Sequence, residues 1–249
     1  MKKFQKVCLV FIILFSIAGI GCMAAALSMG ASIPKRFTRF TRLHGFRVGG
    51  KVKKEYHFDK QQVRSMEIDI GSGTLQVVRG TGNDIILKNS NRDTGIHAEI
   101  KGDKILSIDQ KSSYFWFFGI GSDKDAVLII PEDMDVDELD IDVGSGNVSI
   151  EQISANETVI DCGSGEITVD QMKANGTEID CGSGDVNITF AGLKQDYNYK
   201  IDCGSGDVVI DTEHFSGSEY SRGESGKKSI EIDCGSGDVT IDFLNQEDI

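Results

Sequence analysis

Alternating apolar and polar positions on both sides of a repeated glycine corner dominate the second half of the chain. The tripeptide Gly-Ser-Gly begins at Gly71, Gly144, Gly163, Gly182, Gly204 and Gly235. Every second residue before each corner is apolar, and the alternation resumes after it, as in Ile160 and Cys162 before one corner and Ile167 and Val169 after it. A period of two on each side of a turn predicts two half-buried strands in every repeat.

These repeats predict an all-β fold, a stacked β-solenoid with two to three short strands in each rung of about 19 residues. Successive corners from Gly144 are 19, 19, 22 and 31 residues apart. A repeat this short buries its apolar face only by stacking on neighbours, at a spacing of about 4.8 Å. Glycine at each corner then serves a positive φ or the close approach of the next rung. We interpret the longer offsets as loop insertions, the longest at 213–228, and the runs DIILKN, GIHAEI, KILSID and DAVLIIP as larger, hairpin-rich early turns.

The N-terminal region carries an apolar segment, 7–33, without a charged residue. A helix needs about 20 apolar residues to cross a bilayer, so we favour one retained transmembrane helix. A cleaved signal peptide, with Ala24–Ala26 as its cleavage site, and a lipoprotein signal are the alternatives; the second would need a Leu-like residue where Gly19 precedes Cys22. The predicted organisation is a basic cluster and anchor over 1–33, a basic juxtamembrane linker over 34–54 and an acidic solenoid domain over 55–249.

Charge is divided unevenly along the chain. Residues 1–54 hold eleven basic side chains and no acidic one, whereas the whole chain has 26 basic and 39 acidic residues. The solenoid region is therefore strongly acidic, which excludes nucleic acid as its partner because phosphate binding needs a basic surface.

The basic linker PKRFTRFTRLHGFR points to the lipid membrane as a partner. Its first cations are Lys35, Arg36, Arg39 and Arg42. We expect them to bind anionic headgroups, the alternative being a solvated spacer. Counted by the positive-inside rule they would keep the solenoid in the cytoplasm. A short basic cluster before one apolar segment is the usual export arrangement, and we favour a single-pass cell-membrane protein with an extracytoplasmic solenoid.

The cysteines of the repeats occupy one equivalent position. They are Cys162, Cys181, Cys203 and Cys234. Stacking places them in one inward column whose ends lie about 15 Å apart, too far for one zinc ion with Zn–S bonds of about 2.3 Å. Parallel Cβ vectors also suit a disulfide poorly. Val143 and Ile70 occupy the same position in other repeats, so a small buried hydrophobic residue is the expected role.

In every repeat an aspartate stands directly before the apolar residue that precedes the glycine corner. The six are Asp69, Asp142, Asp161, Asp180, Asp202 and Asp233. The favoured interpretation is an Asx-type cap, in which each carboxylate accepts hydrogen bonds from the amides of its own Gly-Ser turn. The alternative is a row of Ca²⁺ sites formed by Asp142, Asp161, Asp180, Asp202 and Asp233, since Ca²⁺ takes oxygen ligands. The main prediction has no metal and no cofactor.

Five consecutive aromatic residues form a second candidate binding feature. They are Tyr114, Phe115, Trp116, Phe117 and Phe118. Packing over the open end of the solenoid is one interpretation, and a contact patch for a membrane interface or a ligand is the other. The histidines are scattered, and neither CGSG nor GESGKK has the glycine spacing of a nucleotide motif. We therefore predict no catalytic residue.

The run VLIIPEDMDVDELDIDVGSGNVSIEQI and the repeated IDCGSGDVxI resemble the bacterial "putative adhesin" family of domains of unknown function, over about 55–243. The resemblance implies a β-solenoid attached to a membrane anchor in the cell envelope, in some members linked to envelope stress, and it transfers no catalytic residue. We expect a non-enzymatic binding or scaffold protein with an envelope protein or a glycan as its partner. The alternatives are a Ca²⁺-binding solenoid and a carbohydrate-active β-helix enzyme, which would need paired carboxylates with separated pKa values.

Overall fold

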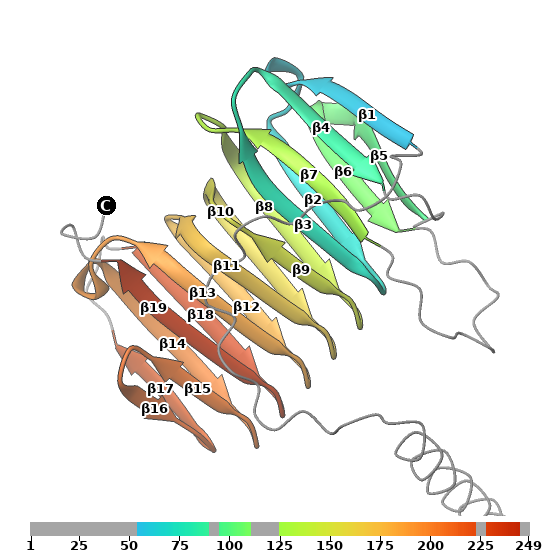
Figure 1. The fold of residues 1–249 in the computed structure, drawn as a ribbon. Coiled ribbons are helices and arrows are strands. Elements are labelled where there is room, and N and C mark those ends of the chain that lie inside the picture. Colours follow the sequence, from blue (N-terminus) through green and yellow to red (C-terminus); the bar gives the residue numbers. More distant parts are fainter. Residues whose placement is uncertain (1–53, 90–94, 111–124, 223–227, 245–249) are drawn as a thin grey trace, which may run out of the picture. The chain divides into compact units, whose positions relative to one another are not determined.

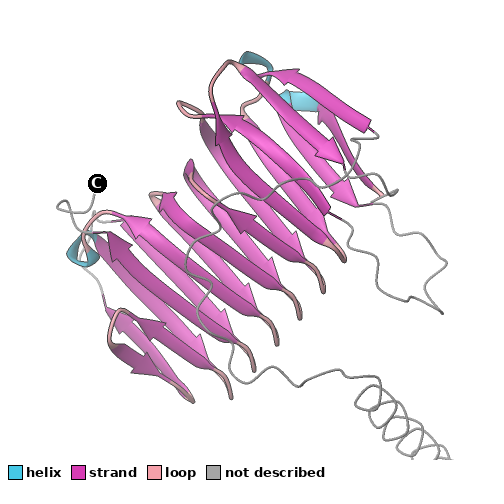
Figure 2. Ribbon diagram, viewed as in Figure 1, coloured by secondary structure: helices cyan, strands magenta, loops and turns pink. Residues whose placement is uncertain are grey.

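The protein is a β-solenoid in which a single sheet wraps around an apolar core (Figure 1). The computed structural model describes residues 54–89, 95–110, 125–222 and 228–244, all within the unit Val48–Ile249. These residues form nineteen strands and three single-turn 3₁₀ helices, η1 (Lys60–Gln62), η2 (Gly102–Lys104) and η4 (Lys194–Asp196) (Figure 2). The predicted all-β solenoid is confirmed.

The sheet has two halves that face each other, which we call layer A and layer B. Layer A contains the strands that precede the glycine corners. In spatial order they are β5 (Ile96–Lys101), β6 (Ile105–Gln110), β2 (Ser65–Ile70), β8 (Asp135–Val143), β10 (Ile153–Cys162), β12 (Gly176–Cys181), β18 (Lys228–Cys234), β14 (Tyr197–Cys203) and β17 (Ser218–Arg222).

Layer B contains the strands that follow the corners. In spatial order they are β1 (Lys54–Asp59), β4 (Asp84–Asn89), β7 (Asp125–Pro131), β3 (Thr74–Gly80), β9 (Asn147–Ile150), β11 (Glu166–Lys173), β13 (Asp185–Ala191), β19 (Asp238–Leu244), β15 (Asp207–Ile210) and β16 (Glu213–Phe215). The two layers are joined where the start of β10 pairs with the end of β11, at Ile153 and Met172. Both of these side chains are buried, as the apolar pattern predicts.

Equivalent residues of neighbouring rungs lie in register. Cys162 pairs with Cys181 and with Val143 across parallel strands, and Cys181 pairs with Cys234. Parallel pairing without a shift places each side chain over the same side chain of the next rung, because the period of two is then kept along the whole stack. The stacking expected from the repeats is therefore confirmed.

The order of the rungs in space differs from their order in the chain. The last rung of the chain, β18 and β19, lies between the rung β12/β13 and the rung β14/β15. At the other end, β2 and β3 lie between β6/β7 and β8/β9. The rungs are therefore not stacked in chain order at either end.

Antiparallel strands close both ends of the stack. β5 covers β6 and β4 covers β7 at one end, while β17 covers β14 and β16 covers β15 at the other. The segment 213–228 is therefore partly an end cap, with β16 and β17, and not simply a loop excursion. Such caps occupy the hydrogen-bonding groups that a bare terminal rung would offer to another chain.

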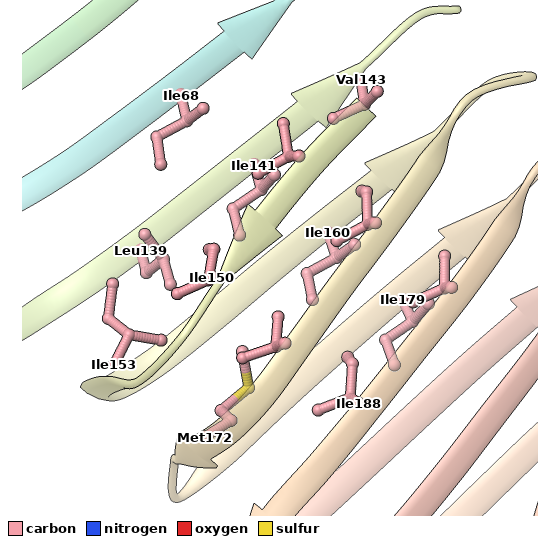
Figure 3. Packing of buried hydrophobic residues seen from close by; sticks show 14 of the residues in the cluster. Ile68, Leu139, Ile141, Val143, Ile150, Ile153, Ile160, Met172, Ile179 and Ile188 are labelled. Carbon is pink, nitrogen blue, oxygen red and sulfur yellow. The ribbon is translucent and has the colours of Figure 1, made fainter. Parts of the chain in front are cut away.

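The core lies between the two layers and consists of aliphatic side chains in columns. Ile68, Ile141, Ile160 and Ile179 follow one another across layer A, with Ile150, Ile188 and Met172 from layer B also in the cluster (Figure 3). Phe190 belongs to the same cluster, and the partly buried Phe243 packs against it, with 5.9 Å between the stacked ring centroids. Because each rung adds side chains to the same columns, the core extends along the stack.

Several predictions fall outside the described residues. The anchor over 1–33, nearly all of the linker over 34–54 and the aromatic residues 114–118 lie there. Within the described part of the chain, no helix has the length and apolar character needed to cross a bilayer. The transmembrane helix stays a prediction.

Candidate binding surface

A backbone ladder runs along the glycine corners and sets the edge between the two layers. The amide of each serine donates to the first glycine carbonyl of the neighbouring corner, for example Ser164 N to Gly144 O at 2.7 Å and Ser183 N to Gly163 O at 2.7 Å. At the end of this ladder the Ser72 amide donates to Gln110 Oε1 at 2.7 Å. The corners therefore stack as regularly as the strands do.

Close approach is what requires glycine at these corners. A Cβ added to Gly165 would overlap the carbonyl oxygen of Gly146, and one added to Gly146 would lie 2.8 Å from the oxygen of Gly73. Among the described corner glycines a positive φ occurs only at Gly73. Of the two reasons that the sequence suggests, the contact between rungs is the general one.

The corner aspartates form one column on the outer surface of layer A. Register places them in the order Asp109, Asp69, Asp142, Asp161, Asp180, Asp233 and Asp202. All except the half-buried Asp109 are exposed, so the side chains point away from the core. Carboxylates of neighbouring rungs repel one another at this spacing.

The Asx-type caps expected from the sequence are not formed in the way predicted. The serine amides that such caps would use donate to carbonyl oxygens of the neighbouring rung, as Ser145 N does to Gly71 O at 2.8 Å. The stacked backbone thus satisfies the corner without the aspartate. A structural need of the turn therefore does not explain why the column is acidic.

Crowding changes the acidity of this surface. Burial and then the carboxylates of Asp142 and Asp109 raise the pKa of Asp69. Burial and then Glu67, Asp142 and Asp161 raise the pKa of Asp140 in the same way. Both shifts mean that the charged form is disfavoured in the folded protein, so a nearby cation would relieve an existing repulsion.

A second outward column continues the acidic character of layer A. In register it contains the buried Ser107 at one end and then Glu67, Asp140, Val159, Glu178, Glu231 and Lys200. Lys200 forms an ion pair with Glu231 on the neighbouring strand. Val159 is 46% exposed, which makes it an exposed large hydrophobic residue on this otherwise charged face.

A shallow hollow of about 370 Å³ lies on this face, over β10, β12, β18 and β14. Its lining includes Glu157, Val159, Glu178 and Lys200. In the next outward column Gly176 pairs with Glu157 on one side and with Ser229 on the other. Two small residues, Gly176 and Ser229, are therefore neighbours in this column. A Cβ on Gly176 would overlap the Glu157 carboxylate, which shows that this side chain leans across the glycine.

Layer B presents a different outer surface. Its second outward column is neutral, and the members are Gln76, Ser149, Thr168, Asn187, Thr240 and Val209. Acidic residues of layer B lie beside the corner, at Glu166, Asp185, Asp238 and Asp207. The two faces therefore share an acidic column beside the corner and differ in the second outward column, which is acidic in layer A and neutral in layer B.

The cysteine column lies in the core and has a structural role. The four thiols are free and buried, and each donates to the last glycine carbonyl of its own corner, for example Cys181 Sγ to Gly184 O at 3.2 Å. Burial raises the pKa of Cys234 to about 11. The hydrogen bond between Cys162 and Cys181 raises the pKa of Cys181 and lowers that of Cys162. A protonated, buried thiol is a poor nucleophile and metal ligand.

The described residues contain no group of three or more His, Cys, Asp or Glu side chains placed to hold one metal ion. The aspartates of the calcium alternative are all present in the acidic column, but each faces its neighbours in a line. The calcium sites, the aromatic patch and the headgroup contacts of Lys35, Arg36, Arg39 and Arg42 stay predictions.

Sequence reasoning missed the hollow and the second acidic column. Both are visible when the repeats are aligned on the cysteine position. The second column stands three residues before it, at Val159, Glu178, Glu231 and Lys200, and the hollow lies over the position five residues before it, at Glu157, Gly176, Ser229 and Asn198. The change from a large to a small residue at that position is the signal that could have predicted the hollow.

Comparisons with known proteins give a family model and several similar solved structures. A family model described as Toastrack DUF4097 matches residues 63–247. A "putative cell adhesion protein" from Clostridium sporogenes has 15% identity and a TM-score of 0.47, covering 77% of this chain and 99% of its own. A "putative adhesin" from Bacteroides fragilis has 18% identity and a TM-score of 0.33 over 77% and 98%. A "putative lipid binding protein" from Parabacteroides distasonis has 13% identity and a TM-score of 0.33 over 76% and 96%. Among curated proteins none matches this chain.

Proposed function

The chain belongs to the Toastrack DUF4097 family, and from this premise we propose that it is a non-enzymatic, membrane-anchored protein of the bacterial cell envelope. Its solenoid binds or scaffolds an envelope partner through the outer face of layer A. The partner presents ammonium or guanidinium groups, on a protein or on an amine-bearing glycan. A link to envelope stress fits a surface-binding role and belongs to the same proposal.

The acidic column is the observation that carries this proposal. Seven rungs each contribute an aspartate in register, although burial and then the neighbouring carboxylates raise the pKa of Asp69. Stability alone would favour neutral residues, and in the second outward column layer B has them whereas layer A carries Glu67, Asp140, Glu178 and Glu231. A surface on which carboxylates repel one another is suited to a cationic ligand, because binding of the cation removes the free-energy cost of that repulsion.

A binding experiment on the full chain in uncharged detergent tests the surface. Oligolysine of about 20 residues should bind at low salt and raise the melting temperature, since it binds the folded face in preference to the unfolded chain. The triple variant Asp161→Asn, Asp180→Asn, Asp233→Asn should lose most of this binding. The matched triple Glu166→Gln, Asp185→Asn, Asp238→Asn removes as many charges from the same three rungs on layer B. It should keep the binding, and equal losses in both triples would refute a specific role for layer A.

Membrane anchoring and orientation need a separate experiment. The protein should sediment with membranes, resist extraction by carbonate, and lose a C-terminal tag to protease added to intact cells. A tag that is cleaved only after lysis would place the solenoid in the cytoplasm and contradict this part of the proposal.

The calcium and enzyme alternatives are tested with the same protein. Millimolar Ca²⁺ should raise the melting temperature no more than NaCl of equal ionic strength. A line of carboxylates does not chelate Ca²⁺, so either salt only screens the repulsion between them. A saturable effect of Ca²⁺ alone would favour the calcium alternative. Cleavage of an acidic glycan that Asp180→Asn abolishes would favour the enzyme.

A further inference from the structure

Four thiols lie in one line inside the core and take no part in the binding surface of layer A. Register places them in the order Cys162, Cys181, Cys234 and Cys203. All four are free, and none is more than 3% exposed. Val143 occupies the next place beyond Cys162, so an aliphatic side chain serves the packing of this position equally well. The column is therefore a set of soft sulfur ligands that folding alone does not require.

Neighbouring sulfurs of this column are close enough to share an ion. The thiols of Cys162 and Cys181 are hydrogen-bonded to each other, and so are those of Cys234 and Cys203. Parallel strands in register place equivalent atoms about 4.8 Å apart. Two metal–sulfur bonds of about 2.3 Å, placed end to end, span about 4.6 Å. One ion therefore fits in a straight line between two neighbouring thiolates with little movement of either strand.

We propose that neighbouring cysteines of the column form two-coordinate sites for a soft, thiophilic metal ion. Cys162 and Cys181 form one pair, and Cys234 and Cys203 form the other. A protonated thiol is a poor ligand, so two S–H bonds break as two metal–sulfur bonds form, and two protons leave to solvent for each ion bound. The column holds two ions, because each thiolate then binds one.

The surroundings of the column exclude hard and four-coordinate ions. Ca²⁺ and Mg²⁺ take oxygen ligands, but the aspartates beside the thiols, such as Asp161 and Asp180, point to the outside. Zn²⁺ takes four ligands, and the described residues include no group of three or more metal-binding side chains around one point. A pair of neighbouring thiols therefore suits only an ion that is satisfied by two ligands.

The apolar core also selects the charge of the ion. Ile160 and Ile179, two residues before the thiols, and Ile167 and Val186, just after the corners, belong to the same buried cluster. A net charge is costly among such side chains. Two thiolates carry two negative charges, so a divalent ion leaves the site neutral. Hg²⁺ binds two thiolates in a line and is the probe that fits both requirements.

Valine is a matched replacement for cysteine in this column. A Cβ added to Gly165 would lie 2.8 Å from Val143 Cγ1, and one added to Gly184 would lie 2.7 Å from Cys162 Sγ. The two side chains thus occupy equivalent space against the glycine of a neighbouring rung. Cys→Val changes should therefore remove ligands and keep the packing of the core.

Two double variants with equal numbers of column thiols test whether adjacency creates the site. Cys162→Val with Cys181→Val, the adjacent variant, leaves Cys234 beside Cys203. Cys181→Val with Cys234→Val, the separated variant, leaves Cys162 and Cys203 three rung steps apart, which is about 14 Å. The two proteins differ only in the spacing of the thiols that remain.

Retention of Hg²⁺ against a competing thiol measures the sites. The parent is the full chain with Cys8→Ser and Cys22→Ser, so that only the column supplies thiols. Parent and variants, in uncharged detergent, are incubated with Hg²⁺ and excess glutathione until the bound amount is constant, and the mercury that remains after gel filtration is measured. Glutathione removes an ion from a single thiol but competes poorly with two thiolates held side by side, whose effective concentration is high.

We expect two ions in the parent, one in the adjacent variant and at least about tenfold less in the separated variant. X-ray absorption of the adjacent variant should show two sulfurs at about 2.3 Å from the ion. All three proteins should melt at similar temperatures, and alanine replaces valine at the same positions if a valine variant does not fold.

Three outcomes would overturn the inference. Equal retention in the two variants means that adjacency does not create the site, and no retention in the adjacent variant means that the column does not bind the ion. Retention that grows with protein concentration means that the ion links two molecules. Oligolysine should bind parent and variants alike, so none of these outcomes changes the test of the proposed function.

Discussion

Layers A and B share one interior and differ on the outside. Within a rung, Ile160 of layer A and Ile167 of layer B are both fully buried and contribute to the same core. On the outer surfaces, Glu178 and Glu231 of layer A correspond to Asn187 and Thr240 of layer B. The same repeat thus serves folding on the inner side of both layers, while the second outward column is acidic in layer A and neutral in layer B. Since the core does not require this asymmetry, we attribute it to binding.

The largest expected effect tests whether the interiors are equivalent. Ile160→Ala and Ile167→Ala should each lower the free energy of unfolding by about 2–5 kcal/mol, because each leaves a cavity in a close-packed column. Urea denaturation followed by circular dichroism measures both. A large difference between the two losses would show that the layers differ inside as well as outside.

A smaller effect is expected at the corner that holds both layers in one register. Gly165→Ala should cost about 1–3 kcal/mol, because its Cβ would overlap the Gly146 carbonyl oxygen of the neighbouring rung. Gly102→Ala is the control, since no atom lies within 4 Å of a Cβ added there. Equal stability of the two variants would mean that the corners do not stack closely.

Much of this architecture could be predicted from the sequence because it depends on local alternation. The period of two assigns Ile160 and Cys162 inward and Asp161 outward, and in-phase repeats then force the columns. The order of the rungs could not be predicted. The strands ending at Cys181, Cys203 and Cys234 share the text IDCGSGDV, so any two of them can pair equally well.

Tertiary context decides the features that the repeats leave open. The end caps depend on where the antiparallel strands β16 and β17 find an edge, which no local pattern specifies. The Asx caps were wrong for a related reason, since the amide of Ser164 has a better-placed acceptor in the neighbouring rung. The sequence of one repeat does not show that a carbonyl of the neighbouring rung competes with the aspartate for this amide.

The pH dependence of stability should sharpen the contrast between the outer faces. The pKa of Asp140 is raised, so its charged form destabilises the fold at neutral pH. This penalty is present above the folded pKa, is relieved as the pH falls toward the ordinary value of 3.8, and is absent below that value. Asp140→Asn should therefore stabilise the protein at pH 7, by less than about 1 kcal/mol because the site is partly solvated.

Asp133 provides the control of opposite sign. Its hydrogen bond with Lys60 lowers its pKa, so its charged form stabilises the fold at neutral pH, and this contribution is lost as the pH falls through the lowered pKa. Asp133→Asn should reduce stability at pH 7. Thermal melting of both variants between about pH 2 and pH 8 covers the two slopes, which lie on either side of the ordinary value of 3.8. Destabilisation by Asp140→Asn at pH 7 would contradict the repulsion assigned to layer A.

The smallest effect on stability is expected at the edge of the hollow, where it separates folding from binding. Lys200 and Glu231 form an ion pair with side chains 60% and 53% exposed. Exposed pairs of this kind contribute little, so Lys200→Gln should leave the melting temperature unchanged. It also removes a cation from the acidic face and frees Glu231 for a ligand, so oligolysine should bind the full chain more tightly at low salt. Titration with labelled oligolysine measures this gain. Unchanged affinity would show that the hollow lies outside the part of layer A that ligands occupy.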